Sequence, residues 1–299
     1  MIRVANAPCS WGVLEFDGES APAAYGQVLD EMRAAGYDGT ELGDWGFMPT
    51  DPPLLASALA LRQLQMIGAF VPVALADPHA HAAGLDTAVR TARLMRDAGA
   101  RDAFIVLSDD NARVAVREQH AGRITPTESL SPRQWVTFAR GATQIAQAVR
   151  DQTGLRTVFH PHCGGYVETP WEIDALMGHT DAAHLGLLID TGHILYGGGD
   201  PLAVLAKHAD RVWHVHVKDC DARVAAQARA AGLGYLQAVR GQLFCELGNG
   251  AVDFRSVVDA LRQMQYDGWV VVEQDVFPGY GTPLASAQRN RAYLRGLGL

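Results

Sequence analysis

Short apolar runs alternate with amphipathic stretches along almost the whole chain. Continuous apolar runs such as 66–76 and 269–272 are typical of strands that a parallel sheet buries on both faces. Stretches such as 132–150, where apolar residues recur every three or four positions, predict helices instead. The pattern predicts strands, each with the start of its following loop, at 2–8, 39–45, 66–76, 102–107, 156–162, 186–190, 211–219 and 269–275.

Helical stretches fill the intervals between these strand candidates. They cover 22–35, 52–64, 85–98, 132–150, 171–177, 200–210, 222–240, 254–265 and 284–294. Eight alternations without a low-complexity linker favour a single (β/α)8 barrel, a TIM barrel that forms one domain over 1–299. A doubly wound sheet is the alternative, but the chain has no G-x-G-x-x-G turn near its start. The polar segment 112–131 is long for a loop, and we expect it to fold over the barrel mouth as a lid.

Composition narrows the class of protein. The 299 residues, 48% of them hydrophobic, can bury one barrel-sized core or two smaller ones, so length alone does not choose. A formal net charge of −8 without a basic stripe argues against nucleic acid and anionic membranes as partners. No run of about 18 apolar residues occurs, and the first residues lack the layout of a secretory signal. We therefore expect a cytoplasmic protein that does not enter a membrane.

The cysteines are few and scattered. There are 4, with no Cys-x-x-Cys pair, so we expect reduced thiols and no cysteine-bound zinc. Cys9 and Cys163 lie near predicted strand ends. A catalytic thiol is therefore one hypothesis, although a small buried cysteine is the commoner case.

Side chains that bind metals or transfer protons gather at the predicted strand ends. In an eight-stranded α/β barrel these ends face one shared mouth, where barrel active sites lie. The candidates are Glu41, His160, His162, Asp190, His193, His214, His216, Lys218 and Glu273. Residues two apart in a strand share a face, so each His-x-His pair presents two imidazoles on one side.

A metal site competes with a plainer interpretation of these residues. A histidine in a barrel strand is more often a core or supporting group than a ligand, and we assign His214, two residues deeper than His216, to that class. Asp190, His216 and Glu273 end three successive strands, and buried charges there need a partner. Mixed imidazole and carboxylate ligands suit Mn²⁺, Co²⁺, Fe²⁺ or Zn²⁺, which would polarise a carbonyl or hydroxyl and stabilise an enolate-like state.

Other residues near the mouth have two interpretations each. Glu41 is either a functional carboxylate or a group that caps the next loop. Lys218 is either solvated or a counter-charge for an oxyanion near the metal. The aromatic side chains of this region either wall a sugar-sized pocket or merely pack, and they are Trp11, Trp45, Phe47 and Tyr166.

Several motifs follow one another from the first strand to the last. They are Asn-Ala-Pro-Cys-Ser-Trp-Gly-Val-Leu-Glu-Phe at 6–16, Gly-Thr-Glu-Leu-Gly at 39–43, His-Pro-His at 160–162 with Glu-Thr at 168–169, Asp-Thr-Gly-His at 190–193, His-Val-His-Val-Lys-Asp at 214–219 and Val-Glu-Gln-Asp at 272–275. Together they resemble the inosose dehydratase family, within the xylose-isomerase-like sugar isomerases, epimerases and dehydratases. The amino-terminal stretch is the most specific to the dehydratase branch.

The resemblance implies a TIM barrel with one divalent metal, commonly Mn²⁺ or Co²⁺ and otherwise Zn²⁺, Fe²⁺ or Mg²⁺, and a homo-oligomer. In the wider superfamily a glutamate, an aspartate, a histidine and a glutamate on strands five to eight hold the metal. The last three correspond to Asp190, His216 and Glu273. His160 takes the place of the strand-five glutamate, so either His160 or His162 binds the ion, or the site is weakened.

The first functional hypothesis, which the resemblance implies, is a metal-dependent lyase that removes water from an inosose-like polyhydroxy ketone. Glu273, Glu41 or a strand-five histidine would take the proton next to the carbonyl. His193 or Lys218 would assist the leaving hydroxyl or the enolate.

Three residues are the candidates for contact with the sugar or cyclitol substrate, namely Trp11, Trp45 and Glu168. Two other functions remain open, a sugar or sugar-phosphate isomerase or epimerase and a non-enzymatic sugar-binding barrel with a degenerate metal site. A metal-dependent endonuclease, known among relatives of this barrel, is disfavoured by the negative charge because phosphate binding needs a basic surface.

Overall fold

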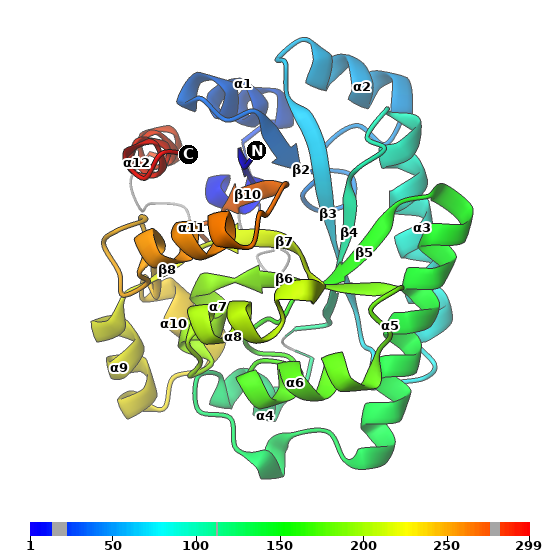
Figure 1. Ribbon diagram of the computed structural model, residues 1–299, viewed down its shortest axis with the longest axis vertical. Helices are drawn as coiled ribbons and strands as arrows, with labels where there is room; N and C mark the ends of the chain where they lie inside the picture. The colour runs from blue at the N-terminus through cyan, green and yellow to red at the C-terminus, as the bar shows by residue number, and fades with distance from the viewer. Residues whose placement is uncertain (14–22, 112, 276–281) are drawn as a thin grey trace.

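The computed structural model describes residues 1–13, 23–111, 113–275 and 282–299. Parallel strands close into a barrel in the order β1-β10-β7-β6-β5-β4-β3-β2, with helices around it (Figure 1). The barrel strands are β1 (Arg3–Asn6), β2 (Gly39–Glu41), β3 (Gln65–Val73), β4 (Phe104–Asp109), β5 (Arg156–Phe159), β6 (Leu185–Asp190), β7 (Val212–Val217) and β10 (Trp269–Val272). This closed barrel confirms the predicted (β/α)8 fold.

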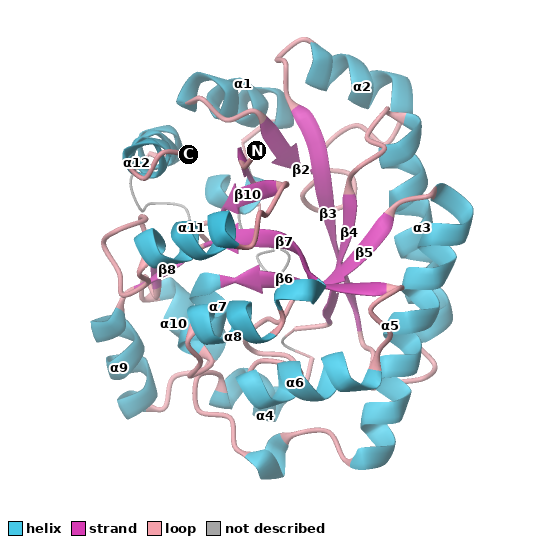
Figure 2. Cartoon of the chain, in the orientation of Figure 1, coloured by secondary structure: helices cyan, strands magenta, loops and turns pink. Residues whose placement is uncertain are grey.

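Helices cover the outside of the barrel (Figure 2). Those that the sequence predicted are α1 (Tyr25–Ala35), α2 (Pro52–Ala60), α3 (His81–Asp97), α5 (Pro132–Thr153), α6 (Pro170–His179), α8 (Pro201–Lys207), α11 (Phe254–Gln263) and α12 (Pro283–Gly296). Short 3-10 turns lie at η1 (Pro8–Trp11), η2 (Pro126–Glu128) and η3 (Ala209–Arg211). Within the described ranges, no helix combines the length and the apolar character that crossing a membrane requires.

The structure differs from the sequence prediction in three helices and one small sheet. The single helix expected over 222–240 was wrong, because Gly232 adopts a φ of 67° and ends α9 (Ala222–Ala231) before α10 (Tyr235–Arg240) begins. Two short helices were not predicted, α4 (Ala115–His120) and α7 (Thr191–Tyr196). An antiparallel pair, β8 (Asp219–Cys220) and β9 (Phe244–Cys245), lies outside the barrel.

Two of the outer helices begin at side-chain caps that the sequence encodes. Ser131 accepts the backbone N–H of Gln134 at the start of α5, and Gln134 accepts that of Ser131 in return. Thr169 and Glu172 make the same reciprocal pair at the start of α6. Such capping boxes satisfy backbone groups that the first helical turn leaves free, so both helices start at defined residues.

The barrel interior below the mouth is a packed core and not a channel. Apolar side chains of β1, β3, β4, β5, β6 and β10 fill it, namely Ala5, Ile67, Phe104, Val106, Val158, Leu188, Trp269 and Val271. Gly186 gives room to Trp213, because a Cβ at Gly186 would lie 2.3 Å from the indole ring. Among the candidate site residues His214 lies deepest in the barrel, where its ring packs against Phe104.

Strand register aligns the polar residues at that end. In the β6–β7 pair Asp190 stands opposite His216, and in the β7–β10 pair His216 stands opposite Val271. His160 and Glu273 directly follow β5 and β10. Because all these strands are parallel, the four polar side chains emerge at the same mouth.

Residues 113–131, the described part of the predicted lid, fold as α4 and η2. The buried Arg117 donates to both carboxylate oxygens of Glu172 on α6, at 3.0 and 2.9 Å, and its Nε donates to the carbonyl of Gly165 at 2.8 Å. The buried ion pair therefore fixes this segment to α6, and the bond to Gly165 fixes it to the loop after β5. Opening of the segment stays a prediction.

Candidate active site

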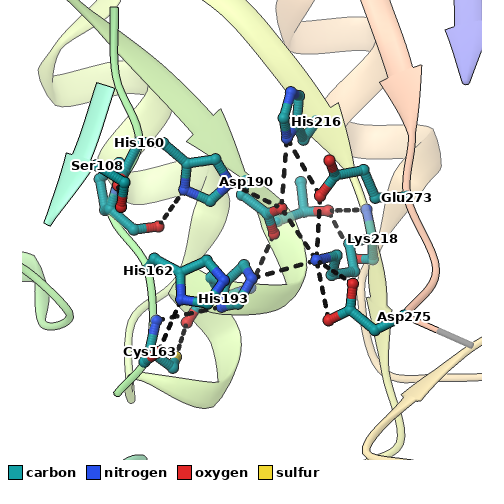
Figure 3. Close-up of polar contacts among 12 residues, drawn as sticks. Ser108, His160, His162, Cys163, Asp190, His193, His216, Lys218, Glu273 and Asp275 are labelled. Carbon is teal, nitrogen blue, oxygen red and sulfur yellow. Dashed lines mark hydrogen bonds and ion pairs between the residues drawn. The ribbon is translucent and has the colours of Figure 1, made fainter. Parts of the chain in front are cut away.

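Four side chains from neighbouring strands converge at the barrel mouth, namely His160, Asp190, His216 and Glu273 (Figure 3). One nitrogen or carboxylate oxygen of each lies within 4.8 Å of those of the other three. All four residues are buried. This group contains the three residues that the sequence assigned to a metal, together with one of the two strand-five histidines.

In both His160 and His216 one ring nitrogen makes a hydrogen bond to the protein. This bond determines which nitrogen faces the carboxylates. His160 donates from Nδ1 to the carbonyl oxygen of Pro161 at 2.8 Å, and its Nε2 lies 3.7 Å from Oδ2 of Asp190. His216 donates from Nε2 to Glu41 at 3.0 Å, and its Nδ1 lies 3.9 Å from the same Asp190 oxygen. In its neutral form, each ring therefore presents an unprotonated nitrogen to the carboxylates.

Two buried atoms of this group have no hydrogen-bond partner in the part of the chain that the structure describes, Oδ2 of Asp190 and Nδ1 of His216. The other oxygen of Asp190 accepts the backbone N–H of His193 at 2.9 Å and so caps α7. Leaving buried polar atoms unpaired is costly. Because imidazole nitrogens and carboxylate oxygens together suit Mn²⁺, Co²⁺, Fe²⁺ or Zn²⁺, the donor set fits one divalent ion.

Burial and charge set the protonation of the group. Burial raises the pKa of Asp190 to about 6 and holds that of His160 well below its usual range. Burial would also raise the pKa of Glu273, but His216 and Lys218 hold it well below the usual value. Burial would lower the pKa of His216, yet Glu273 and Glu41 raise it to about 10. The carboxylates thus favour positive charge at this point, and a divalent ion would displace the proton of His216.

Lys218 is a buried cation beside the four-residue group (Figure 3). Its Nζ lies 3.0 Å from Oε2 of Glu273 and donates to the two oxygens of Asp275 at 3.2 and 3.3 Å. The same Nζ lies 3.2 Å from Nε2 of His193. Burial would lower the pKa of Lys218, but Asp275 and Glu273 hold it well above its usual value. Lys218 is therefore charged, and carboxylates of β10's loop balance it.

Glu41 reaches across the barrel from β2 to β7. Its Oε1 accepts from Nε2 of His214 at 2.9 Å and from Nε2 of His216 at 3.0 Å. Burial would raise the pKa of Glu41, but the two histidines lower it to about 2. These three residues are also close enough to hold a metal, yet the two N–H groups already occupy the shared oxygen. This second group is therefore closed by hydrogen bonds.

A pocket with a cavity volume of about 70 Å³ opens over the four-residue group, and His160 and Glu273 of that group form part of its wall. Its wall combines ionisable side chains with apolar ones, and it is lined by Ala7, Pro8, Cys9, Val13, Glu41, Gly43, Asp44, Phe70, His160, His162, Lys218, Glu273 and Asp275. The pocket is suited to a small molecule with several polar groups.

His162 and His193 lie beside the four-residue group and are not part of it. Their ring centres are 3.8 Å apart. His162 lines the pocket and donates from Nδ1 to the carbonyl of Cys163 at 2.7 Å, and burial lowers its pKa to about 3. Of the two strand-five histidines, His160 is the one whose free nitrogen faces the carboxylates.

The two tryptophans predicted to contact substrate lie away from the wall of this pocket. Trp11 is buried in the core, and its Nε1 donates to Glu31 at 2.7 Å. Trp45 is 40% exposed, stacks against the guanidinium of Arg90 at 4.1 Å and lines a neighbouring pocket. The geometry thus gives Trp11 a packing role and Trp45 a position beside the site.

Glu168, the third predicted substrate contact, is buried outside the wall of the pocket. Its carboxylate accepts the backbone N–H groups of Gly122 at 2.6 Å and Gly164 at 3.0 Å. These bonds tie the segment after α4 to the loop after β5. In this geometry Glu168 anchors loops.

The thiols near the mouth are protonated. Burial raises the pKa of Cys9 and of Cys163 well above the usual value. Cys9 lines the pocket, whereas Sγ of Cys163 donates to the carbonyl of His193 at 3.3 Å. Because the thiolate is the nucleophilic form, this geometry gives the catalytic-thiol hypothesis no support.

Asp275 is a site residue that the sequence analysis included in a motif but did not single out. It lines the pocket, and burial raises its pKa while Lys218 opposes that rise. Its spacing could have found it, because Asp275 stands two positions beyond Glu273, where strand residues share a face. Asp275 is thus a negative charge that balances Lys218, and this role was not predicted from the sequence.

Comparisons with known proteins identify the family of the chain. A family model described as "Xylose isomerase-like TIM barrel" matches residues 29–297. The inosose dehydratase of Geobacillus kaustophilus (strain HTA426) is 32% identical over 98% of this chain and 93% of its own length. The rhizopine catabolism protein MocC of Rhizobium meliloti is 33% identical over 96% of this chain and 86% of its own.

Solved structures share the fold at low sequence identity. An L-ribulose 3-epimerase superimposes with a TM-score of 0.72 and 20% identity over 100% of this chain and 95% of its own. The probable 3-DHS dehydratase AsbF of Bacillus anthracis gives a TM-score of 0.69 and 13% identity over 99% of each chain. At these identities the similarity shows the fold alone.

Proposed function

Because the chain belongs to the inosose dehydratase family of xylose isomerase-like TIM barrels, we propose that it removes water from an inosose or a related polyhydroxy ketone. The relatives' names supply the substrate class. The observation that carries the proposal is the convergence of His160, Asp190, His216 and Glu273 at a pocket lined by ionisable and apolar side chains. The resemblance to the family also implies a homo-oligomer, and the cytoplasmic location stays an expectation from the sequence.

One divalent ion, Mn²⁺ or Co²⁺, is the proposed cofactor. Nε2 of His160, Oδ2 of Asp190, Nδ1 of His216 and the carboxylate of Glu273 would hold it. Such an ion supplies a Lewis acid that polarises the ketone and makes the adjacent C–H more acidic. Support comes from the two buried atoms, Oδ2 of Asp190 and Nδ1 of His216, that no described residue satisfies.

We assign the two proton transfers to Glu273 and Lys218. Glu273 is ionised and lines the pocket, so it takes the proton from the carbon next to the carbonyl. Lys218, the one Lys or Arg among the described residues of the pocket wall, gives a proton to the leaving hydroxyl, which departs as water. Each transfer contributes about 10²–10⁴-fold to the rate. Oε2 of Glu273 lies 3.0 Å from Nζ of Lys218, so Glu273 can pass the proton it has taken back to Lys218 between turnovers, and both groups are then restored.

An epimerase or isomerase that uses the same enolate without expelling water is the second candidate. The resemblance implies two facing glutamates for an epimerase. In the described four-residue group Glu273 is the single glutamate, and His160 stands where the second would be. This difference favours dehydration.

Metal analysis tests the cofactor. We expect about one Mn, Co, Fe or Zn ion per chain in the purified protein and its loss in the Asp190→Ala variant. An equal metal content in the two proteins would contradict the assigned site. The exposed Asp200→Ala exchange, which affects a helix cap, controls for loss of a carboxylate.

Turnover of an inosose tests the reaction. The wild-type protein is expected to form an ultraviolet-absorbing conjugated product that is lighter than the substrate by one water. The Glu273→Gln variant should lose at least about 10²-fold in kcat with its circular dichroism unchanged. A product of unchanged mass would favour the isomerase, and full activity of the variant would remove Glu273 from the mechanism.

A further inference from the structure

We propose that Glu41 is a positioning residue, which keeps the proton of His216 on Nε2 so that Nδ1 is free to bind a metal. This inference rests on the proposed metal site and adds a residue to it. From its place at a strand end, Glu41 was predicted as one candidate to take a proton from the substrate. In the structure, however, Glu41 contacts His216, so we assign it the role of orienting that side chain.

The first step is the hydrogen bond between Glu41 and His216. Oε1 of Glu41 lies between two ring nitrogens, 3.0 Å from Nε2 of His216 and 2.9 Å from Nε2 of His214, and accepts from both, so Nε2 of His216 carries a hydrogen. In a neutral imidazole the other nitrogen, Nδ1, then has a lone pair. That lone pair faces Asp190 and Glu273, which is the direction that a metal ligand needs.

A second acceptor, Glu273, competes with Glu41 for the hydrogen of His216. Oε2 of Glu273 lies 3.3 Å from Nδ1 of His216, so it offers an acceptor for a hydrogen on that nitrogen. Without Glu41, His216 would gain by carrying its hydrogen on Nδ1, pointed into the ligand group. Glu41 therefore decides between two tautomers, one of which blocks the metal.

The third step is the way in which Glu41 is itself held. His214 donates from Nε2 to the same Oε1 at 2.9 Å, so the two histidines of β7 hold one oxygen between them. Nδ1 of His214 has no hydrogen-bond partner among the described residues. Its ring lies against Phe104, with centres 5.3 Å apart. The polar contact of His214 is thus made with Glu41. This contact explains why a histidine lies deeper in the barrel than the proposed metal ligands.

The fourth step is the space that the carboxylate needs. A Cβ at Gly68 in β3 would lie 2.8 Å from Oε1 of Glu41 and 3.2 Å from its Cδ. The register between β2 and β3 shifts between Thr40 and Glu41, just where this side chain enters the barrel. Gly68 therefore leaves the room in which Glu41 meets the histidines.

Calorimetric titration with Co²⁺ tests the proposal. Glu41→Leu removes the acceptor and should weaken Co²⁺ binding by about 10- to 100-fold, the usual effect of losing a partner that orients a ligand. Gly68→Ala should act in the same direction because it displaces the carboxylate without deleting a polar group. Glu41→Gln keeps an oxygen that accepts from both histidines and should retain most of the affinity. Gly178→Ala, at an open helical position, is the control for added methyl groups.

Nitrogen chemical shifts of ¹⁵N-histidine-labelled protein with Zn²⁺ separate positioning from a general structural effect. We expect His216 of the wild type to carry hydrogen on Nε2 with a metal-bound Nδ1, and Glu41→Leu to lose this state. Wild-type Co²⁺ affinity and an unchanged His216 tautomer in Glu41→Leu would overturn the proposal. Equal Co²⁺ binding by wild type and Asp190→Ala would refute the metal site itself, which is a distinguishable result.

Discussion

Asp190 uses its two carboxylate oxygens for different neighbours. Oδ1 caps α7 through the N–H of His193, and this bond fixes the rotation of the carboxylate so that Oδ2 faces the imidazoles. Gly192, between them, lets Lys218 approach, because a Cβ there would lie 2.8 Å from Cγ of Lys218. The Asp-Thr-Gly-His motif therefore combines a helix cap, a close approach and a proposed metal ligand in four residues.

Replacement of Asp275 by Asn tests the environment of Lys218. The variant keeps a polar side chain of equal size but removes the first counter-charge of the Lys218 ammonium. We expect kcat to fall by up to about 10²-fold, because the ionic contact that positions Lys218 for proton transfer is lost. The metal content should not change. Steady-state kinetics and metal analysis provide the measurement. Asp267→Asn, at an exposed carboxylate, is the matched control, and equal kcat in all three proteins would contradict the role.

Individual site residues could be predicted where they stand at the end of an apolar run that reads as a strand. His160, Asp190, His216 and Glu273 each stand at or beside the carboxyl end of an apolar run, and the fold brings such ends together. The bond between Glu41 and His214 joins residues 173 positions apart and crosses the barrel. Periodicity along the chain carries no information on such a contact, because it depends on how the barrel closes.

Among the helices, α4 depends on a buried ion pair. Arg117 and Glu172 are both fully buried, and the pair is bidentate. Arg117→Ala leaves an uncompensated carboxylate inside the protein, so we expect a loss of about 3–5 kcal/mol in the free energy of unfolding. Urea denaturation measures it. Lys207→Ala, which breaks an exposed pair with Asp174, should cost at most about 1 kcal/mol, and equal costs would contradict the argument.

The loop anchor Glu168 predicts a pH effect on stability. Burial raises its pKa to about 7, while the groups that face it are Arg117 on α4, Glu172 on α6, and Cys163 and Tyr196 on neighbouring segments. The folded state therefore binds the proton more tightly than the unfolded chain. The stability from this group is present below about pH 4.5 and is lost as the pH rises through about 7.

The measurement is urea unfolding of wild type and Glu168→Gln between pH 5 and about 8. We expect the wild type to lose up to about 3 kcal/mol more than the variant over this range. Other buried carboxyl groups contribute equally to both proteins and cancel in the difference. Parallel pH profiles for the two proteins would show that Glu168 does not titrate in this way.

Element boundaries followed the sequence where a local rule sets them. Capped starts such as Ser131 and the helix end at Gly154, with a φ of 79°, coincide with residues that favour those conformations. The Ala-rich stretch 222–240 looked continuous because alanine favours helix at every position. Two glycines in its middle decide otherwise, since Gly232 takes a left-handed conformation and Gly234 starts the next helix.

At the scale of the molecule, the alternation of apolar runs with helical stretches was sufficient to predict the barrel fold. Parallel strands buried on both faces give continuous apolar runs, and the right number of them leaves few other architectures. What the alternation could not give is the arrangement of the loops above the mouth. There the backbone is held by single contacts, such as those of Arg117 and Glu168, that come from distant parts of the chain.

The barrel closes along one seam, where β1 pairs with β10 from Arg3 opposite Trp269 to Asn6 opposite Val272. Glu273 directly follows that seam, so the fourth candidate ligand reaches the other three only when the first and the last barrel strands pair. Without β10 the sheet is open and three candidate ligands remain. An ion held by all four, as proposed, would therefore bind only the closed barrel and would stabilise its seam.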